Sequence, residues 1–116
     1  MEIIKTMGNL TKGEMFNMTQ GQNLGKVSDR VGEVIKVDSY IIYEDADQDG
    51  DIQKVLVFKD VNGELSATIS KTFIEQFEKL VDFMGEEEYS IQVIGKKSKN
   101  GRDYITCAVS SLKSPE

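Results

Sequence analysis

Two short stretches of the chain gather side chains of a single charge sign, and both could bind ions or ligands. The first, DADQDGD at 45–51, has aspartate at its first, third and fifth positions and glycine at its sixth, the order that opens a calcium-binding EF-hand loop. Such a loop closes with a bidentate Glu at its twelfth position, which here is Leu56. An acidic turn is therefore the simpler interpretation, and a weak calcium-binding module at 45–56 stays an alternative.

The second stretch is basic. GKKSKNGR at 95–102 carries four positive charges and no acid, and Tyr104 follows two residues after Arg102, on the same face of an extended strand. Cations beside an aromatic ring suit the binding of single-stranded nucleic acid, because the cations meet phosphates while the ring stacks a base. The plainer alternative is a lysine-rich, solvated turn.

Composition excludes several classes of function. The chain has 116 residues, enough for one domain with one core. It contains no histidine and a single cysteine, Cys107, which we interpret as a buried strand thiol. Zinc chemistry and Ser-His or Cys-His hydrolysis are therefore excluded, and no phosphate-loop or nucleophile-elbow motif occurs. We expect a protein that is not an enzyme and needs no metal or cofactor.

The N-terminal stretch MEIIKTMGNL is too short in apolar residues for a secretory signal or a membrane span, so we expect a cytoplasmic protein with no membrane partner. The net charge of −6 argues by itself against a nucleic-acid binder. The distribution matters more, because the acids concentrate at 44–51 and 86–88 while 95–102 is basic.

Hydrophobic periodicity predicts a mainly β chain with one clear helix. The helix covers about 72–84, with a capping box from Thr72 to Glu75, a stop at Gly85, and Phe73 and Phe77 assigned to packing. The expected strands are 27–37, 39–44, 52–60, 64–70 as a further strand or a continuation of the sheet, 89–95 and 102–112. Asn-Gly signals mark turns at 61–63 and 99–101.

This order predicts a five-stranded OB-like Greek-key barrel with its one α-helix between strands 3 and 4. An open antiparallel sheet with one packed helix is the alternative. We expect a single domain over 1–116, with short strands or loop in the N-terminal residues 1–26 and a short tail at 113–116. The strand at 1–7 could pair with a second subunit through an open edge, as in a homodimer.

Strands two and three offer further aromatic and cationic groups. Tyr40 and Tyr43 lie on opposite faces of 39–44, so at least one of them belongs to the core, and the sequence does not say which. The full candidate interface for nucleic acid consists of Arg30, Lys36, Tyr40, Tyr43, Lys54, Lys96, Lys97, Lys99, Arg102 and Tyr104.

In order and spacing, several segments resemble the small single-stranded-DNA-binding proteins of phages and mobile elements of Gram-positive bacteria. They are FNMTQGQ at 16–22, KVSDRVGEVI at 26–35, KVLVFKDVNGELSATIS at 54–70, LVDF in the helix, and GKKSKNGRDYITCAVSSL at 95–112. The resemblance implies an OB-like protein that coats and protects single-stranded DNA during replication, with little sequence preference and no catalysis. By the same resemblance, the bound DNA would contact Lys96 to Arg102 and Tyr104.

The same resemblance implies a bacterial host cytoplasm as the location and replication or recombination proteins as further partners. The chain differs from the general bacterial single-stranded-DNA-binding proteins, because it ends in SLKSPE without an acidic tail tipped by a hydrophobic motif. A small protein-interaction or regulatory domain with no nucleic-acid role is the competing hypothesis.

Overall fold

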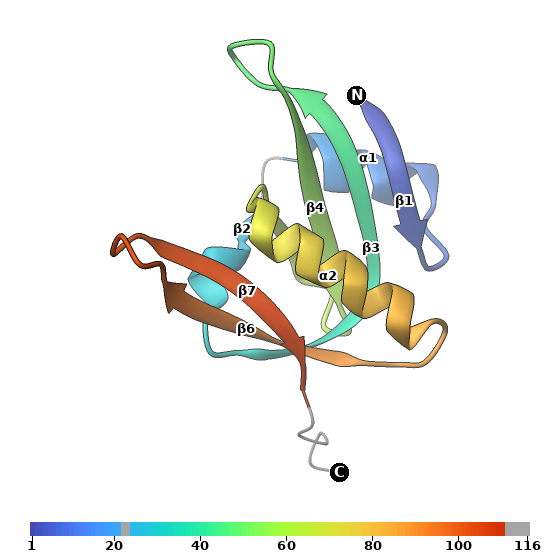
Figure 1. Cartoon of the computed structure of the whole chain (residues 1–116). Coiled ribbons are helices and arrows are strands. Elements are labelled where there is room, and N and C mark those ends of the chain that lie inside the picture. Colours follow the sequence, from blue (N-terminus) through green and yellow to red (C-terminus); the bar gives the residue numbers. More distant parts are fainter. Residues whose placement is uncertain (22–23, 111–116) are drawn as a thin grey trace.

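The chain folds into a curled, mainly β structure in which two helices cover opposite faces of the sheet (Figure 1). The computed structural model describes residues 1–21 and 24–110. The elements, in chain order, are β1 (Glu2–Met7), α1 (Lys12–Gln20), β2 (Gly25–Lys26), the 3-10 turn η1 (Val27–Arg30), β3 (Val34–Ala46), β4 (Ile52–Asp60), β5 (Leu65–Thr68), α2 (Lys71–Met84), β6 (Ser90–Lys97) and β7 (Asp103–Val109).

The long strand β3 joins two regions of the sheet. Its first residues, 34–36, pair antiparallel with β6, whereas its later residues pair with β4 on one edge and with β1 on the other. A register shift between Val37 and Ser39 marks the bend between these two regions. The sheet order is β2-β5-β4-β3-β6-β7, and no pairing joins β5 to β7 among the described residues. The curled sheet is therefore a half-barrel that is open between β5 and β7. We call this gap the seam.

The mainly β class is as expected, but the strand count and the helix placement differ from the expectation. The described residues form seven strands rather than five, and α2 follows the fifth strand and precedes the sixth. The difference arises because the N-terminal region adds β1, α1 and β2 before the strands that the pattern identified. The expected tail 113–116, the last two residues of 102–112 and two residues of the N-terminal loop lie outside the described residues.

The segment 27–37, expected to be one strand, begins instead with η1. Val27 is buried there, Gly32 adopts a φ of 90°, and extended structure starts only at Val34. The expected second strand at 39–44 is the continuation of β3, which runs unbroken from Val34 to Ala46. The apolar residues of the turn and of the strand happen to alternate as those of a single strand do. The sequence pattern therefore did not reveal the turn.

Part of the N-terminal region 1–26, expected to consist of short strands or loop, forms the helix α1 instead. A capping box starts this helix: the Thr11 hydroxyl accepts a hydrogen bond from the Glu14 N–H (3.1 Å), and the Glu14 carboxylate accepts one from the Thr11 N–H (3.4 Å). Met18 is buried while Phe16 is exposed, so the helix presents a narrow apolar face. The capping residues, rather than hydrophobic periodicity, were the signal for this helix.

The helix α2 agrees with the predicted range to within one residue. Its N-cap is Ser70 rather than Thr72, since the Ser70 hydroxyl accepts the hydrogen bond from the Phe73 N–H. Gly85 ends the helix as expected, and its N–H donates to the Val81 carbonyl. The apolar face of α2 packs on β7 as well as on β3 and β4, with the Phe77 ring 5.1 Å from that of Tyr40 and 6.3 Å from that of Phe58.

Burial on the two sheet faces follows the strand period. Tyr40 and Ile42 point into the core beneath α2, while Ile41 and Tyr43 point to the smaller core beneath α1. Cys107 belongs to the α2 core, as expected for a strand thiol, and burial raises the pKa of its thiol to about 12. The chain thus needs apolar residues on both faces of its central strands.

A buried ion pair connects η1 to β4. The Arg30 guanidinium lies 3.1 Å from the Asp60 carboxylate and donates to the Ser66 hydroxyl at 3.0 Å. The Arg30 side chain is 11% exposed and that of Asp60 only 3% exposed, so neither charge is well solvated. Asp60 also accepts two backbone N–H groups of the following turn. This contact holds the start of β3 against the end of β4.

We predict that Arg30→Ala lowers the free energy of unfolding by about 3 kcal/mol, because it leaves the Asp60 carboxylate buried without its counter-ion. Urea unfolding monitored by circular dichroism measures the change. As a control, Lys54→Ala removes only an exposed ion pair to Glu78 and should cost less than about 1 kcal/mol. Equal losses in the two variants would contradict a structural role for the buried pair.

Candidate nucleic-acid interface

The basic stretch forms the hairpin between β6 and β7, as the Asn-Gly signal predicted. Gly101 adopts a φ of 78°, which favours glycine, and the Ser98 N–H donates to the Arg102 carbonyl at 2.8 Å. The Ser98 hydroxyl also accepts a hydrogen bond from the Arg102 N–H at 3.2 Å. These bonds keep the tip folded and present its side chains to solvent.

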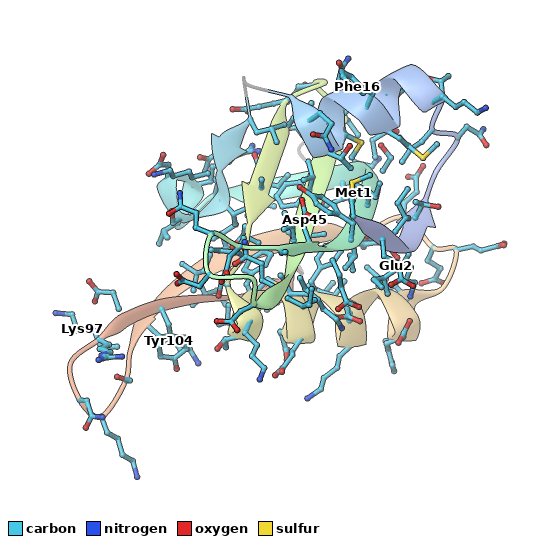
Figure 2. All side chains as sticks on the ribbon, turned by 90° about the horizontal axis from the view of Figure 1, so that it is seen from above. Met1, Glu2, Phe16, Asp45, Lys97 and Tyr104 are labelled. Atoms are coloured by element: carbon cyan, nitrogen blue, oxygen red, sulfur yellow. The ribbon has the colours of Figure 1, made fainter. Side chains whose placement is uncertain are left out.

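The pairing of the two strands brings an aromatic ring and a cation together. Lys96 lies directly opposite Tyr104, so their side chains share one face of the hairpin. Lys97 lies opposite Asp103, an acid just beyond the basic stretch whose charge opposes that of the lysines. Figure 2 shows Lys97 and Tyr104 on the hairpin where it extends away from the body of the protein.

The cations of the hairpin are available to an anionic ligand. Within the described part of the chain, no carboxylate forms an ion pair with Lys96, Lys97, Lys99 or Arg102, and all four are exposed. Asp103 is the nearest acid to this hairpin, and because it forms no ion pair with these cations, phosphates can approach them without breaking one.

A groove of about 730 Å³ runs along the seam beside this hairpin. One wall consists of the hairpin residues from Gly95 to Lys97 and from Asp103 to Ile105, and the other of η1 and the end of β5. Gly95 allows the walls to approach, since a Cβ there would lie 3.0 Å from a methyl group of Val31. Beyond Tyr104 the surface continues into a shallower hollow lined by Arg102 and Thr72.

The first turn of α2 faces the same region. Ser70 lines the large groove and Thr72 lines the hollow beside Arg102, and the first turn of this helix contains no acid. The positive end of the helix dipole therefore points toward the groove and adds to the potential of the hairpin cations.

Three of the candidate cations already have carboxylate partners. Arg30 is held in the buried pair with Asp60, while Lys36 lies 3.1 Å from Glu88 and Lys54 lies 3.2 Å from Glu78. None of the three lines the groove at the seam. The structure thus does not bring them together with the hairpin, and Arg30 serves the fold instead.

Neither tyrosine of β3 offers a free ring face. Tyr40 is 1% exposed beneath α2, and Tyr43 is 6% exposed beneath α1, where its hydroxyl donates to the Thr19 carbonyl at 3.4 Å. Burial is the main reason that the pKa of each phenol is raised. The sequence pattern required one of these rings to be core, and the second helix makes both of them core.

The acidic stretch forms the tip of the β3–β4 hairpin, far from the basic hairpin in Figure 1. Its flanks are strands, whereas an EF-hand loop lies between helices. One Asp47 carboxylate oxygen accepts the N–H groups of Asp49 (2.9 Å) and Asp51 (3.0 Å), so this carboxylate already closes the turn. Among the described residues, no group of three or more potential ligands is placed to hold a metal ion.

Sequence reasoning missed several residues that line the groove, above all Ile69, Ser28 and Val31. Ile69 ends a stretch that has strand character, and such an isoleucine is normally buried. Here β5 ends at Thr68 and α2 begins at Lys71, so Ile69 lies in the connection and is 61% exposed. No pattern in the sequence distinguishes an exposed connector residue from a buried strand residue.

The model of the phage single-stranded DNA-binding protein family matches residues 3–110, which is nearly the whole chain. The chain belongs to this family. No curated protein and no solved structure shows significant similarity to it. As a member of the phage single-stranded DNA-binding proteins, the chain binds single-stranded DNA in phage DNA replication and is not an enzyme.

The charges of this phage single-stranded DNA-binding protein are divided between two hairpins, so its net charge of −6 does not by itself oppose DNA binding. Phosphates interact mainly with charges within about 8 Å at physiological salt, and more distant acids have little effect on them. In Figure 2 Asp45, at the base of the acidic hairpin, lies away from Lys97.

No helix in the described part of the chain is long and apolar enough to span a membrane.

We predict that millimolar calcium leaves the melting temperature unchanged, because the loop lacks a closing Glu and Asp47 already accepts two backbone N–H groups. Thermal denaturation with and without calcium measures this. Asp47→Ala should destabilise the protein by about 1 kcal/mol through loss of these hydrogen bonds. A rise in melting temperature with calcium that disappears in Asp47→Ala would instead establish a metal site.

Proposed function

We propose that the β6–β7 hairpin and the adjoining seam form the surface that holds single-stranded DNA. The observation that carries the proposal is that Lys96 and Lys97, which form no ion pair among the described residues, line one groove with the partly exposed Tyr104. Asp103 is the one acid in that lining. Lys96, Lys97, Lys99 and Arg102 neutralise phosphates, while Tyr104 stacks a base. These contacts recognise backbone charge and ring faces common to every base, so binding has little sequence preference and protects whichever strand is exposed.

We propose further that the fold is an open form of the OB barrel. The strands β3 to β7 correspond to its five strands, with α2 between the third and fourth of them, and the bent β3 pairs with both β4 and β6. On this correspondence the basic hairpin is the loop between strands four and five, one of two loops that grip oligonucleotides in such barrels. The whole chain acts as one binding domain.

The wider setting follows from this function as a set of proposals. The protein acts in the cytoplasm of the bacterial host, where phage DNA is copied, and works beside replication or recombination proteins. The strand β1 pairs only with β3 among the described residues, and its exposed Ile3 and Ile4 lie at a sheet edge. A homodimer through this edge stays a prediction, and light scattering after size-exclusion chromatography tests it.

Tyrosine fluorescence gives a direct test of binding. The chain has no tryptophan and four tyrosines, of which Tyr40, Tyr43 and Tyr89 are buried. Titration with an oligothymidylate should therefore quench the emission of Tyr104 selectively. Absence of any binding at low salt would overturn the proposed function in favour of a protein-interaction domain.

We predict that Tyr104→Ala weakens binding by about 1–3 kcal/mol, the range for loss of one base stack. Anisotropy of a fluorescently labelled oligothymidylate measures the affinity without relying on tyrosine emission. Tyr104→Phe is the matched control, since it retains the ring and should bind nearly as well as the original protein while losing the quenching. Unchanged affinity in the alanine variant would move the stacking site elsewhere.

We predict that Lys97→Ala lowers the slope of log affinity against log salt by about 0.7, the value for one phosphate contact on a single strand. The comparison variant is Lys79→Ala, which removes the same charge from the exposed face of α2, outside the seam. Its slope should equal that of the original protein. A common decrease in both variants would mean that net charge, rather than the hairpin, controls affinity.

A further inference from the structure

The helix α1 covers the middle of the sheet face that OB barrels use for oligonucleotides, the face of β4 and β5 on the proposed correspondence. Met18 of α1 is buried against Ile41 and Val57, with Met15 packed beside it. These contacts close the centre of the face to a ligand. A strand that leaves the basic hairpin must therefore follow another route or stay at the edge of this face.

A strip at the edge of the same face remains open. A second groove of about 340 Å³ passes over Val55 and Ala67 and reaches Lys26 on β2. Ser28, Thr68 and Ile69 line both this groove and the large groove at the seam, so the two are continuous. The parallel pairing of Lys26 with Ala67 holds the lysine beside β5.

At Ile69 the surface divides into two branches. One branch leads to Lys26 and has no acid among its lining residues, whereas the other, of about 350 Å³, is lined by Glu44 and Glu75. The second branch also contains Lys71 and Lys54, and the charge of Lys54 is paired with Glu78, so its lining balances two acids against two lysines. Electrostatics therefore favour the branch to Lys26 for a polyanion.

Lys26 and Ile69 have properties that binding would explain. Lys26 is exposed and has no carboxylate partner within the described part of the chain, as for the hairpin cations. Ile69 exposes 61% of its surface at the junction of three hollows. Exposure of this apolar side chain to water is unfavourable. A base lying on Ile69 would cover this apolar surface.

We propose that single-stranded DNA continues from the basic hairpin along the seam, crosses Ile69 and reaches a second phosphate contact at Lys26. The proposal rests on the proposed function and extends it to a binding path with two ends, the hairpin at one and Lys26 at the other. A short oligonucleotide fills the hairpin end alone. Only a longer one spans both ends.

The test uses the full chain and labelled oligothymidylates from about 4 to about 16 nucleotides, the range of lengths bound by single OB domains. With long oligonucleotides, Lys26→Ala should lower the salt slope by about 0.7 and weaken binding several-fold. With the shortest ones it should bind as the original protein does. Lys79→Ala serves as the matched control and should have no effect at any length.

Two further variants separate the branches. Ile69→Ser should weaken binding of long oligonucleotides several-fold, because the apolar contact at the junction is lost. Lys71→Ala removes the exposed lysine of the acidic branch and should have less effect than Lys26→Ala. The path is overturned if Lys26→Ala behaves as Lys79→Ala at every length, or if Lys71→Ala causes the larger loss.

Failure of this path and failure of the proposed function give different results. If the original protein binds and Tyr104→Ala weakens it while Lys26→Ala does not, the hairpin site stands and the path to Lys26 is wrong. If hairpin variants bind as well as the original protein, the proposed site itself is wrong. Melting temperatures within a few degrees of the original protein show that the surface variants are folded, which is expected for exposed side chains.

Discussion

The bend in β3 is the constraint on which the rest of the structure depends. One strand pairs with β6 through its first three residues and with β4 and β1 through the remainder, so both regions of the sheet meet along it. Because the two regions diverge from this strand, β5 and β7 face each other without pairing among the described residues. The groove at the seam is a direct result, and its two walls belong to different regions of the sheet.

The buried Arg30–Asp60 pair supports this arrangement from the side of η1. Arg30 joins the turn before β3 to the end of β4 and to Ser66 of β5, and η1 in turn supplies Ser28 to the groove. A cation that the sequence offered as a contact for DNA thus holds one wall of the groove in place, and its loss would act first on stability.

Charge division explains how a protein with a net charge of −6 binds a polyanion. The acidic tip of the β3–β4 hairpin and the basic tip of the β6–β7 hairpin extend to different ends of the molecule (Figure 1). Carboxylates form ion pairs with Arg30, Lys36 and Lys54. Among the described residues, no carboxylate forms an ion pair with a cation of the basic hairpin. The unpaired cations are therefore concentrated at the basic hairpin although the sum over the chain is negative.

The amino-acid sequence alone determined the features that depend on neighbours along the chain. The range of α2 follows from its apolar spacing and Gly85, the basic hairpin follows from an Asn-Gly turn between two alternating strands, and the missing closing Glu at Leu56 argues against an EF-hand. Family membership also follows from order and spacing over nearly the whole chain. These are local or linear properties, which a one-dimensional pattern records.

Only the tertiary structure decided which charged and aromatic residues are exposed and which are buried or paired. Tyr40 and Tyr43 alternate along β3 as a surface and a core residue would, yet a helix on each face buries both. The buried partners of Arg30, Asp60 and Ser66, lie 30 and 36 residues away, and the exposure of Ile69 depends on where β5 ends relative to α2. Burial and ion pairing join residues distant along the chain, so no local spacing could have separated the groove residues from those that hold the fold together.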